Sequence, residues 1–311
     1  MVLKKSSPLF LAAAFAFLGL PVSLFAQTAV MYYVPGLYYQ TYSSSSSFST
    51  SFNFSVARQG QGDIDFFVTV DGGLSNSFTP RYATSGTDRI EYYIYDNLTD
   101  RNILKAGSTI GTQDVISGGF NDPSSWYETT TASYSIFVPA DQFLPLGEYR
   151  DTLTFTLYTG TPSNYNPSTA VSLSVPVVLA TERYLALRLA AAGGTFASGT
   201  QAYTLNFGNL WEGQTKELDM IVSSTIYFDV AFSSANRGKL KQDGGSDLAP
   251  YQFRLDDDTV DLSSGWKLDL QNEGPTIGGE RAYRIQVEIG DVTGLDAGTY
   301  RDSITVSVMA R

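Results

Sequence analysis

One segment occurs twice in this chain, and it limits the possible folds more than any other feature. Residues 147–157 (GEYRDTLTFTL) and 298–308 (GTYRDSITVSV) carry a glycine, a tyrosine, an arginine and an aspartate in the same order. In both copies, apolar and hydroxyl-bearing residues then alternate with a period of two, which is typical of a half-buried β-strand. Two copies near the ends of two long segments predict two homologous β domains in tandem.

Each copy is typical of a turn followed by a strand with one apolar face. Tyr149 and Tyr300 come after the turn like the tyrosine of a tyrosine corner, whose hydroxyl pins a loop in immunoglobulin-like (Ig-like) sandwiches. Because Arg150–Asp151 and Arg301–Asp302 are repeated in both copies, we expect them to be structural near this turn, not catalytic. The inward-facing apolar residues are predicted to be Leu153, Phe155 and Leu157 in the first copy, and Ile304, Val306 and Val308 in the second.

The rest of the chain shows the same strand-like pattern. Residues 64–70 and 90–94 alternate between apolar and other side chains, and clusters of Gly, Asp and Asn come after them. Helical periodicity is almost absent. The sequence therefore predicts an all-β protein of two tandem Ig-like β-sandwich domains.

The two copies are continued differently along the chain. After the first, a turn-rich loop precedes the alternating residues 171–179, which we interpret as the last strand of the first domain. Pro176 would restrict this strand to an edge-type position. The alternative is that residues 171–179 form the first strand of the second domain. After the second copy the sequence ends at Arg311, so we expect a second domain that lacks its last strand and exposes an apolar groove. A strand from another chain could fill that groove.

The first residues are typical of an export signal. Lys4 and Lys5 precede an apolar run over residues 9–20, and a plausible cleavage site lies after Ala26. We therefore predict a signal peptide over 1–26, an N-terminal domain over 27–180 and a C-terminal domain over 181–311. No later stretch is long enough for a membrane span, so we expect export through the periplasm to the cell surface.

The composition excludes several kinds of chemistry. The chain has no His and no Cys, which rules out Ser–His–Asp and Cys–His nucleophiles and ordinary zinc sites. A net charge of −11 argues against nucleic acid as a partner. The acidic run over residues 256–258 lacks the spacing of a calcium loop and is interpreted as a solvated hairpin tip. We expect no enzyme activity, no cofactor and no metal.

Two aromatic segments are candidates for an adhesive surface, because exposed apolar patches mark interaction sites and aromatic rings also stack on sugars. For residues 31–39 the alternative is a first strand with core aromatics and a turn at Pro35-Gly36. For residues 118–127 the alternative is a loop folded back onto the sandwich. The candidate residues are Tyr32, Tyr33, Leu37, Tyr38 and Tyr39 in the first segment, and Phe120, Trp126 and Tyr127 in the second.

Several ordered motifs resemble a known family. Residues 205–210 (LNFGNL), 232–241 (FSSANRGKLK) and 250–251 (PY) precede the terminal Gly-Thr-Tyr-Arg-Asp segment. Together they resemble the spore coat protein U domain, the pilin-type domain of archaic chaperone–usher pili. The resemblance covers most of residues 184–311, and over residues 28–180 it rests mainly on the Gly-Tyr-Arg-Asp segment. Many members of the family carry cysteines that this chain lacks.

The resemblance implies an incomplete Ig-like fold that is assembled by donor-strand exchange. It implies as partners a periplasmic chaperone, an outer-membrane usher and an adjacent pilin subunit that donates a strand. Two-domain members resemble tip adhesins, whose N-terminal domain binds a surface or receptor, here unknown, so a tip adhesin is our leading hypothesis. One alternative is a structural shaft or spore-coat-type subunit, for which residues 27–42 could be the donor segment. The other alternative is a secreted carbohydrate-binding module.

Overall fold

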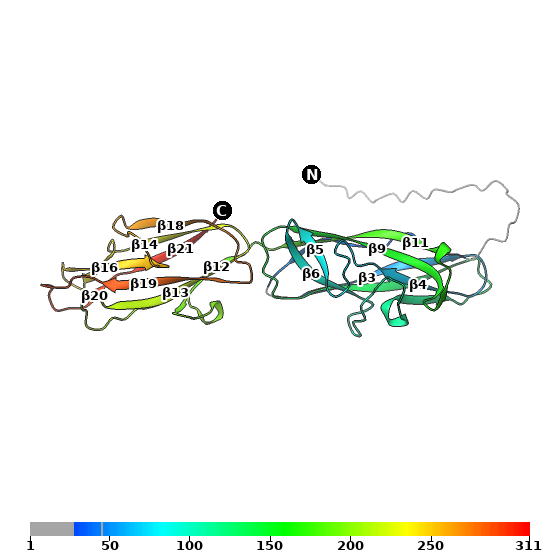
Figure 1. The fold of residues 1–311 in the computed structure, drawn as a ribbon, viewed down its shortest axis with the longest axis horizontal. Helices are drawn as coiled ribbons and strands as arrows, with labels where there is room; N and C mark the ends of the chain where they lie inside the picture. Colours follow the sequence, from blue (N-terminus) through cyan, green and yellow to red (C-terminus); the bar gives the residue numbers. More distant parts are fainter. Residues whose placement is uncertain (1–27, 45) are drawn as a thin grey trace, which may run out of the picture.

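The computed structural model describes residues 28–44 and 46–311, and almost all of their regular structure is β-strand. The predicted signal peptide lies outside the described residues. Helical structure in the described part is limited to short 3₁₀ turns at Thr112–Asp114, Pro167–Thr169 and Phe196–Ser198. None of these described helices could cross a membrane. Figure 1 shows two groups of strands lying end to end, as the all-β, two-domain prediction requires.

The first group of strands forms one continuous hydrogen-bonded sheet that folds over into two layers. Its order is β1-β3-β8-β6-β5-β9-β11-β2, while β4 pairs with β9 and β7, and β10 pairs with β9. The strands are β1 (Thr28–Met31), β2 (Leu37–Tyr42), β3 (Phe48–Gln59), β4 (Ile64–Val70), β5 (Arg81–Ser85), β6 (Asp88–Tyr95), β7 (Ile116–Phe120), β8 (Tyr127–Val138), β9 (Glu148–Thr161), β10 (Asn164–Tyr165) and β11 (Val171–Thr181).

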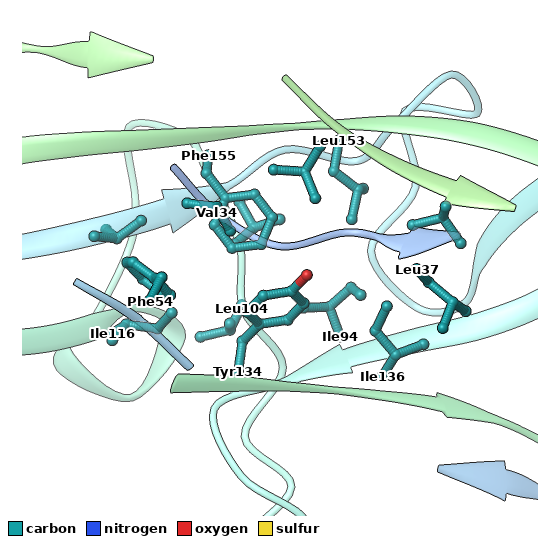
Figure 2. Packing of buried hydrophobic residues seen from close by; sticks show 14 of the residues in the cluster. Val34, Leu37, Phe54, Ile94, Leu104, Ile116, Tyr134, Ile136, Leu153 and Phe155 are labelled. Carbon is teal, nitrogen blue, oxygen red and sulfur yellow. The ribbon is translucent and has the colours of Figure 1, made fainter. Parts of the chain in front are cut away.

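The core of the first domain lies between these two layers. Because side chains alternate along a strand, the apolar residues of each period-two segment gather on one face. Figure 2 shows Phe54 and Tyr134 from one layer facing Leu153 and Phe155 from the other. The rings of Tyr134 and Phe155 lie 4.8 Å apart between centroids.

The second group of strands has a separate core and two sheets. One sheet has the order β12-β13-β19-β16-β15-β20, with β17 paired to β16, and the other has the order β18-β14-β21. A second buried cluster, which includes Met220, Phe232 and Ile285, lies among these strands. The strands are β12 (Leu185–Ala191), β13 (Thr215–Ser224), β14 (Phe228–Ser234), β15 (Lys239–Gln242), β16 (Leu248–Leu255), β17 (Asp258–Thr259), β18 (Trp266–Glu273), β19 (Arg281–Ile289), β20 (Tyr300–Arg301) and β21 (Ile304–Ala310).

The alternating residues 171–179 belong to the first group of strands. They lie in β11, which pairs antiparallel with β9 from Val171 opposite Leu157 to Ala180 opposite Glu148. The expected edge position is wrong for the C-terminal part of β11, because β2 pairs with its other side from Val177 onward. Pro176 is tolerated because it comes just before that pairing begins. The predicted boundary after residue 180 falls next to the end of β11 and stays a prediction.

A short segment joins the two groups of strands, and Thr225 anchors it. The Thr225 hydroxyl donates to the carbonyl of Glu182 at 2.8 Å, and it accepts a hydrogen bond from the Tyr184 N–H at 2.8 Å. The Thr225 carbonyl accepts a hydrogen bond of 2.6 Å from the N–H of Leu146 in the first domain. The hydroxyl and the carbonyl of the buried Thr225 therefore both have hydrogen-bond partners where the two domains meet.

Candidate functional site

In the first domain, the apolar face of the repeated strand is covered. Leu153, Phe155 and Leu157 of β9 are fully buried. The adjacent strand β11 places Val175 opposite Leu153 and Leu173 opposite Phe155. The first copy of the repeat therefore lies inside a completed sheet.

In the second domain, the corresponding strand has one open edge. Strand β21 pairs with β14 from Ile304 opposite Ser234 to Ala310 opposite Phe228, and no strand among the described residues pairs with its other side. As a result Ile304, Val306 and Val308 are only half-buried, although they pack against the second core. The same sequence pattern is thus buried in one domain and partly exposed in the other.

A groove of about 1020 Å³ runs along this open edge. It lies among β20, β21 and the segment 203–210, which has no strand partner. The lining contains both polar and apolar side chains, and a site that takes an apolar strand needs the apolar ones. The apolar lining residues include Leu189, Leu205, Phe207, Phe253, Ile304 and Val306.

The sequence predicted the side of this groove that β21 forms, but not the side that residues 203–210 form. Leu205 and Phe207 belong to the segment that carried the family resemblance, but no role in the groove was expected of them. Both are half-buried against the second core. Their sequence pattern could have predicted this role, because Leu205 and Phe207 alternate with polar residues in a segment that has no obvious partner strand.

The tyrosines of the two repeats make the same hydrogen bond. Tyr149 donates to the carbonyl of Pro145 at 2.9 Å, and Tyr300 donates to the carbonyl of Asp296 at 2.7 Å. In each case the acceptor lies four residues earlier, so the hydroxyl closes the turn before the strand, as in a tyrosine corner. Burial raises the pKa of Tyr149 to about 12, so its hydroxyl keeps its proton at neutral pH.

The aspartates of the two repeats also have equivalent partners. Asp151 accepts a hydrogen bond of 2.5 Å from the hydroxyl of Tyr92, and Asp302 accepts one of 2.5 Å from the hydroxyl of Tyr251. Burial raises the pKa of Asp151. Each carboxylate joins the repeated segment to a strand that does not pair with it, β6 through Tyr92 and β16 through Tyr251, which is a structural arrangement.

The arginines of the repeats face outward. Arg150 pairs with Glu148, and Arg301 pairs with Asp243 at 3.1 Å. Among the residues with described positions, no three His, Cys, Asp or Glu side chains are arranged to hold a metal ion.

The first aromatic segment presents four tyrosines to solvent. Tyr32, Tyr33, Tyr38 and Tyr39 are each between 62% and 64% exposed. Leu37 does not belong with them. It is buried in the core (Figure 2), so its assignment to the adhesive set is wrong.

A β-bulge explains why Tyr38 and Tyr39 both point outward. Val177 of β11 lies opposite Leu37, and Leu179 lies opposite Gln40, so β2 has one residue more than β11 over this stretch. Tyr39 adopts a left-handed backbone conformation with φ of 56°, which is rare for a bulky side chain.

The residues around these tyrosines are held firmly in the first domain. β1 pairs with β3, and β2 pairs with β11. The hydroxyl of Tyr134 donates to the carbonyl of Pro35. Gly36 passes so close to β11 that a Cβ there would lie 2.5 Å from the carbonyl oxygen of Pro176. Residues 28–42 are therefore part of the sandwich, which is not the arrangement of an unpaired donor segment.

The second aromatic segment divides into buried and exposed residues. Trp126 and Tyr127 are more than half exposed. Phe120 is buried, with its ring 5.3 Å from that of Phe66, so its assignment to the adhesive set is wrong. The fully buried Arg58 fixes the loop between them through hydrogen bonds to the carbonyls of residues 122 and 125, at 2.8 Å and 2.7 Å.

Comparison with solved structures finds extended but remote similarity. The CsuC–CsuE chaperone–tip adhesion subunit complex of Acinetobacter baumannii matches with 14% identity over 91% of this chain and 99% of that chain, with a TM-score of 0.40. The CupB6 tip adhesin of Pseudomonas aeruginosa matches with 12% identity over 90% of this chain and 93% of its own, with a TM-score of 0.36. CfaE, the adhesive subunit of CFA/I fimbria of enterotoxigenic Escherichia coli, matches with 12% identity over 89% and 93%, with a TM-score of 0.37. TM-scores this low do not establish a shared function.

A family model gives the more direct comparison. No curated protein matches the chain. The model of the Spore Coat Protein U domain matches residues 36–156, which run from Gly36 in the first domain into β9. The match lies in the first domain, where the sequence resemblance rested mainly on the Gly-Tyr-Arg-Asp segment. The assignment of residues 184–311 to the same family stays a prediction. The resemblance to the Spore Coat Protein U domain is therefore confirmed for residues 36–156.

Proposed function

We propose that this protein is the tip adhesin of an archaic chaperone–usher pilus. Its second domain is completed by a strand from an adjacent pilin subunit, and its first domain binds a surface or receptor. The observation that carries this proposal is the contrast between the two repeats. In the first domain β11 pairs alongside the buried Leu153, Phe155 and Leu157. In the second domain Ile304, Val306 and Val308 lie on the open edge of β21, and Ile304 and Val306 border the groove.

Adding a strand to this groove would be energetically favourable. Each apolar side chain that becomes fully buried contributes roughly 1.5–3 kcal/mol at most, and a half-buried side chain gains only part of that. Each backbone hydrogen bond to the open edge of β21 adds about 0.5–1.5 kcal/mol. A periplasmic chaperone would cover the groove during export, and an outer-membrane usher would bring in the subunit that replaces it.

The structure of the first domain provides a template for the incoming strand. β11 lies antiparallel to β9 and directs alternate apolar residues inward from Val171 to Leu179. A strand with the same direction and register beside β21 would begin near Val308 and run back toward Tyr300. It would place its apolar residues beside Val308, Val306 and Ile304.

Two further observations favour the tip over the shaft. Residues 28–42 are paired within the first domain, so they do not form an unattached donor segment. The four exposed tyrosines give that domain an aromatic surface of the kind that binds other molecules. Aromatic side chains also stack on sugars, so a carbohydrate receptor is compatible with the same surface.

The groove can be tested by fusing a donor strand to the full chain. Residues 170–181 (AVSLSVPVVLAT) would be attached after Arg311 through a flexible linker, and thermal unfolding would be compared with the unfused protein. We expect the second domain to unfold at a clearly higher temperature. The control fusion replaces Val171, Leu173, Val175, Val177 and Leu179 with Ser in the added segment only. Equal midpoints for all three proteins would contradict the donor-strand proposal.

A further inference from the structure

We propose that the strand that completes the second domain carries an acidic side chain facing Lys241 and Arg301. This inference rests on the donor-strand function proposed above and specifies the chemistry of the partner. Lys241 of β15 lies directly opposite Arg301 of β20. Like charges in this cross-strand position repel each other.

The repulsion is not present at the equivalent place in the first domain. There Arg150 occupies the position of Arg301 in the repeat, and the residue opposite it is the uncharged Thr84. The second domain has a cation at the position where the first has a hydroxyl. Lys239 lies two residues before Lys241 on the same face of β15, and it is also exposed.

The carboxylates nearby do not compensate fully for these cations. Asp243 pairs with Arg301 at 3.1 Å, but their side chains are 51% and 73% exposed, so water screens the pair. Asp302 is engaged elsewhere, because it accepts hydrogen bonds from Ser234 at 2.6 Å and Tyr251 at 2.5 Å. The ion pair of Arg301 is therefore with one solvent-exposed carboxylate, and among the described residues no ion pair engages Lys241.

The register of β11 fixes where an incoming acidic residue would lie. In the first domain Val178 is the residue of β11 opposite Arg150, and its neighbours Val177 and Leu179 are directed into the core. A donor strand in the same register would place the residue equivalent to Val178 opposite Arg301. Val178 is itself buried in the first domain, and it lies on the face opposite to Val177 and Leu179. In the second domain the equivalent residue would lie next to Arg301, which also borders a hollow of about 310 Å³ together with Lys241 and Asp243. An Asp or Glu at this position would add a negative charge next to the two cations and so reduce the repulsion between Lys241 and Arg301.

Binding of free peptides to the full chain tests this inference. Three peptides would carry the sequence of residues 170–181 with Glu, Gln or Lys at the position of Val178. Glu and Gln have nearly the same size, so their difference isolates charge. We expect the Glu peptide to bind about two- to fivefold more tightly than the Gln peptide at low ionic strength, and the Lys peptide to bind most weakly. The Glu–Gln difference should shrink at high salt, because the site is exposed.

A charge reversal in the protein provides the decisive comparison. Lys241→Glu should abolish the preference for the Glu peptide and improve binding of the Lys peptide. Lys216→Glu makes the same charge change on β13 and should leave the preference unchanged. If Glu and Gln peptides bind equally to the wild-type protein, the acidic partner is wrong while the donor-strand function stands. If no peptide binds, the donor-strand function itself fails.

Discussion

At the scale of single residues, the tyrosine corners should contribute to stability in both domains. Tyr149→Phe removes the hydroxyl that donates to the carbonyl of Pro145, which keeps a second hydrogen bond of 2.9 Å from the hydroxyl of Thr181. We expect a loss of about 0.5–1.5 kcal/mol in the free energy of unfolding. Tyr300→Phe should cost less, because Tyr300 is only half-buried. Urea denaturation followed by fluorescence measures both effects.

The control for the corner variants is Tyr227→Phe, which changes an exposed tyrosine in the second domain. It should leave stability within about 0.5 kcal/mol of the wild-type value. If Tyr149→Phe is as mild as this control, the hydrogen bond to Pro145 does not stabilise the turn.

The exposed tyrosines allow adhesion to be separated from folding. Replacing Tyr32, Tyr33, Tyr38 and Tyr39 with Ser should reduce retention on apolar beads, because the change removes most of the aromatic surface of residues 31–39. The unfolding midpoint should change little, since these side chains contribute little to the core. A matched control replaces the exposed Tyr227 and Trp266 of the second domain with Ser. Equal retention of all three proteins would contradict an adhesive role for the tyrosines.

At the scale of elements, the bulge in β2 determines which side chains enter the core. Leu37 and Tyr42 are both buried, although an odd number of steps separates them along the chain. In a regular strand they would face opposite sides, and the extra residue of the bulge brings both inward.

Deleting Tyr39 should remove the bulge and leave Leu37 and Tyr42 an even number of steps apart, so a regular β2 could still bury both side chains. We therefore expect the deletion to cost less than about 2 kcal/mol, the scale of an apolar side chain taken out of the core. Tyr39→Gly is the matched control. It keeps the bulge and suits the left-handed backbone at φ of 56°, so its stability should equal or exceed that of the wild type. Calorimetry of both variants checks this, and a loss of about 2 kcal/mol or more in the deletion variant would show that β2 needs the bulge to bury Leu37 and Tyr42.

At the scale of the whole molecule, stability above pH 6 should depend on pH only at alkaline values. The chain has no His and no Cys, so few groups titrate between pH 6 and 9. Burial raises the pKa of Tyr149 and of Tyr283 to about 12, and it also raises the pKa of Tyr92.

The unfolded chain ionises its tyrosines near pH 10, whereas the folded protein keeps these three protonated. Their contribution to stability is therefore fully present below about pH 10 and is lost as the pH rises toward 12. Thermal midpoints at constant ionic strength should be flat from pH 6 to 9 and fall above pH 10. A pronounced fall between pH 6 and 8 would contradict this interpretation.

The sequence by itself determined the class of the protein and much of its local structure. Alternation along residues 153–157 and 304–308 predicts strands, because the direction of successive side chains is a local property of an extended backbone. The absence of His and Cys excludes their chemistry without any reference to the fold. Only the tertiary structure decided which apolar faces are covered.

Leu153 and Ile304 occupy equivalent places in the repeat, yet only Leu153 has a paired strand, β11, on the side where β21 is open. The burial of Leu37 depends on its pairing with Val177, far away along the chain. Phe120 is buried because Phe66 and Arg58 pack around it. Such outcomes depend on contacts between distant segments, and a pattern of neighbouring residues does not encode them.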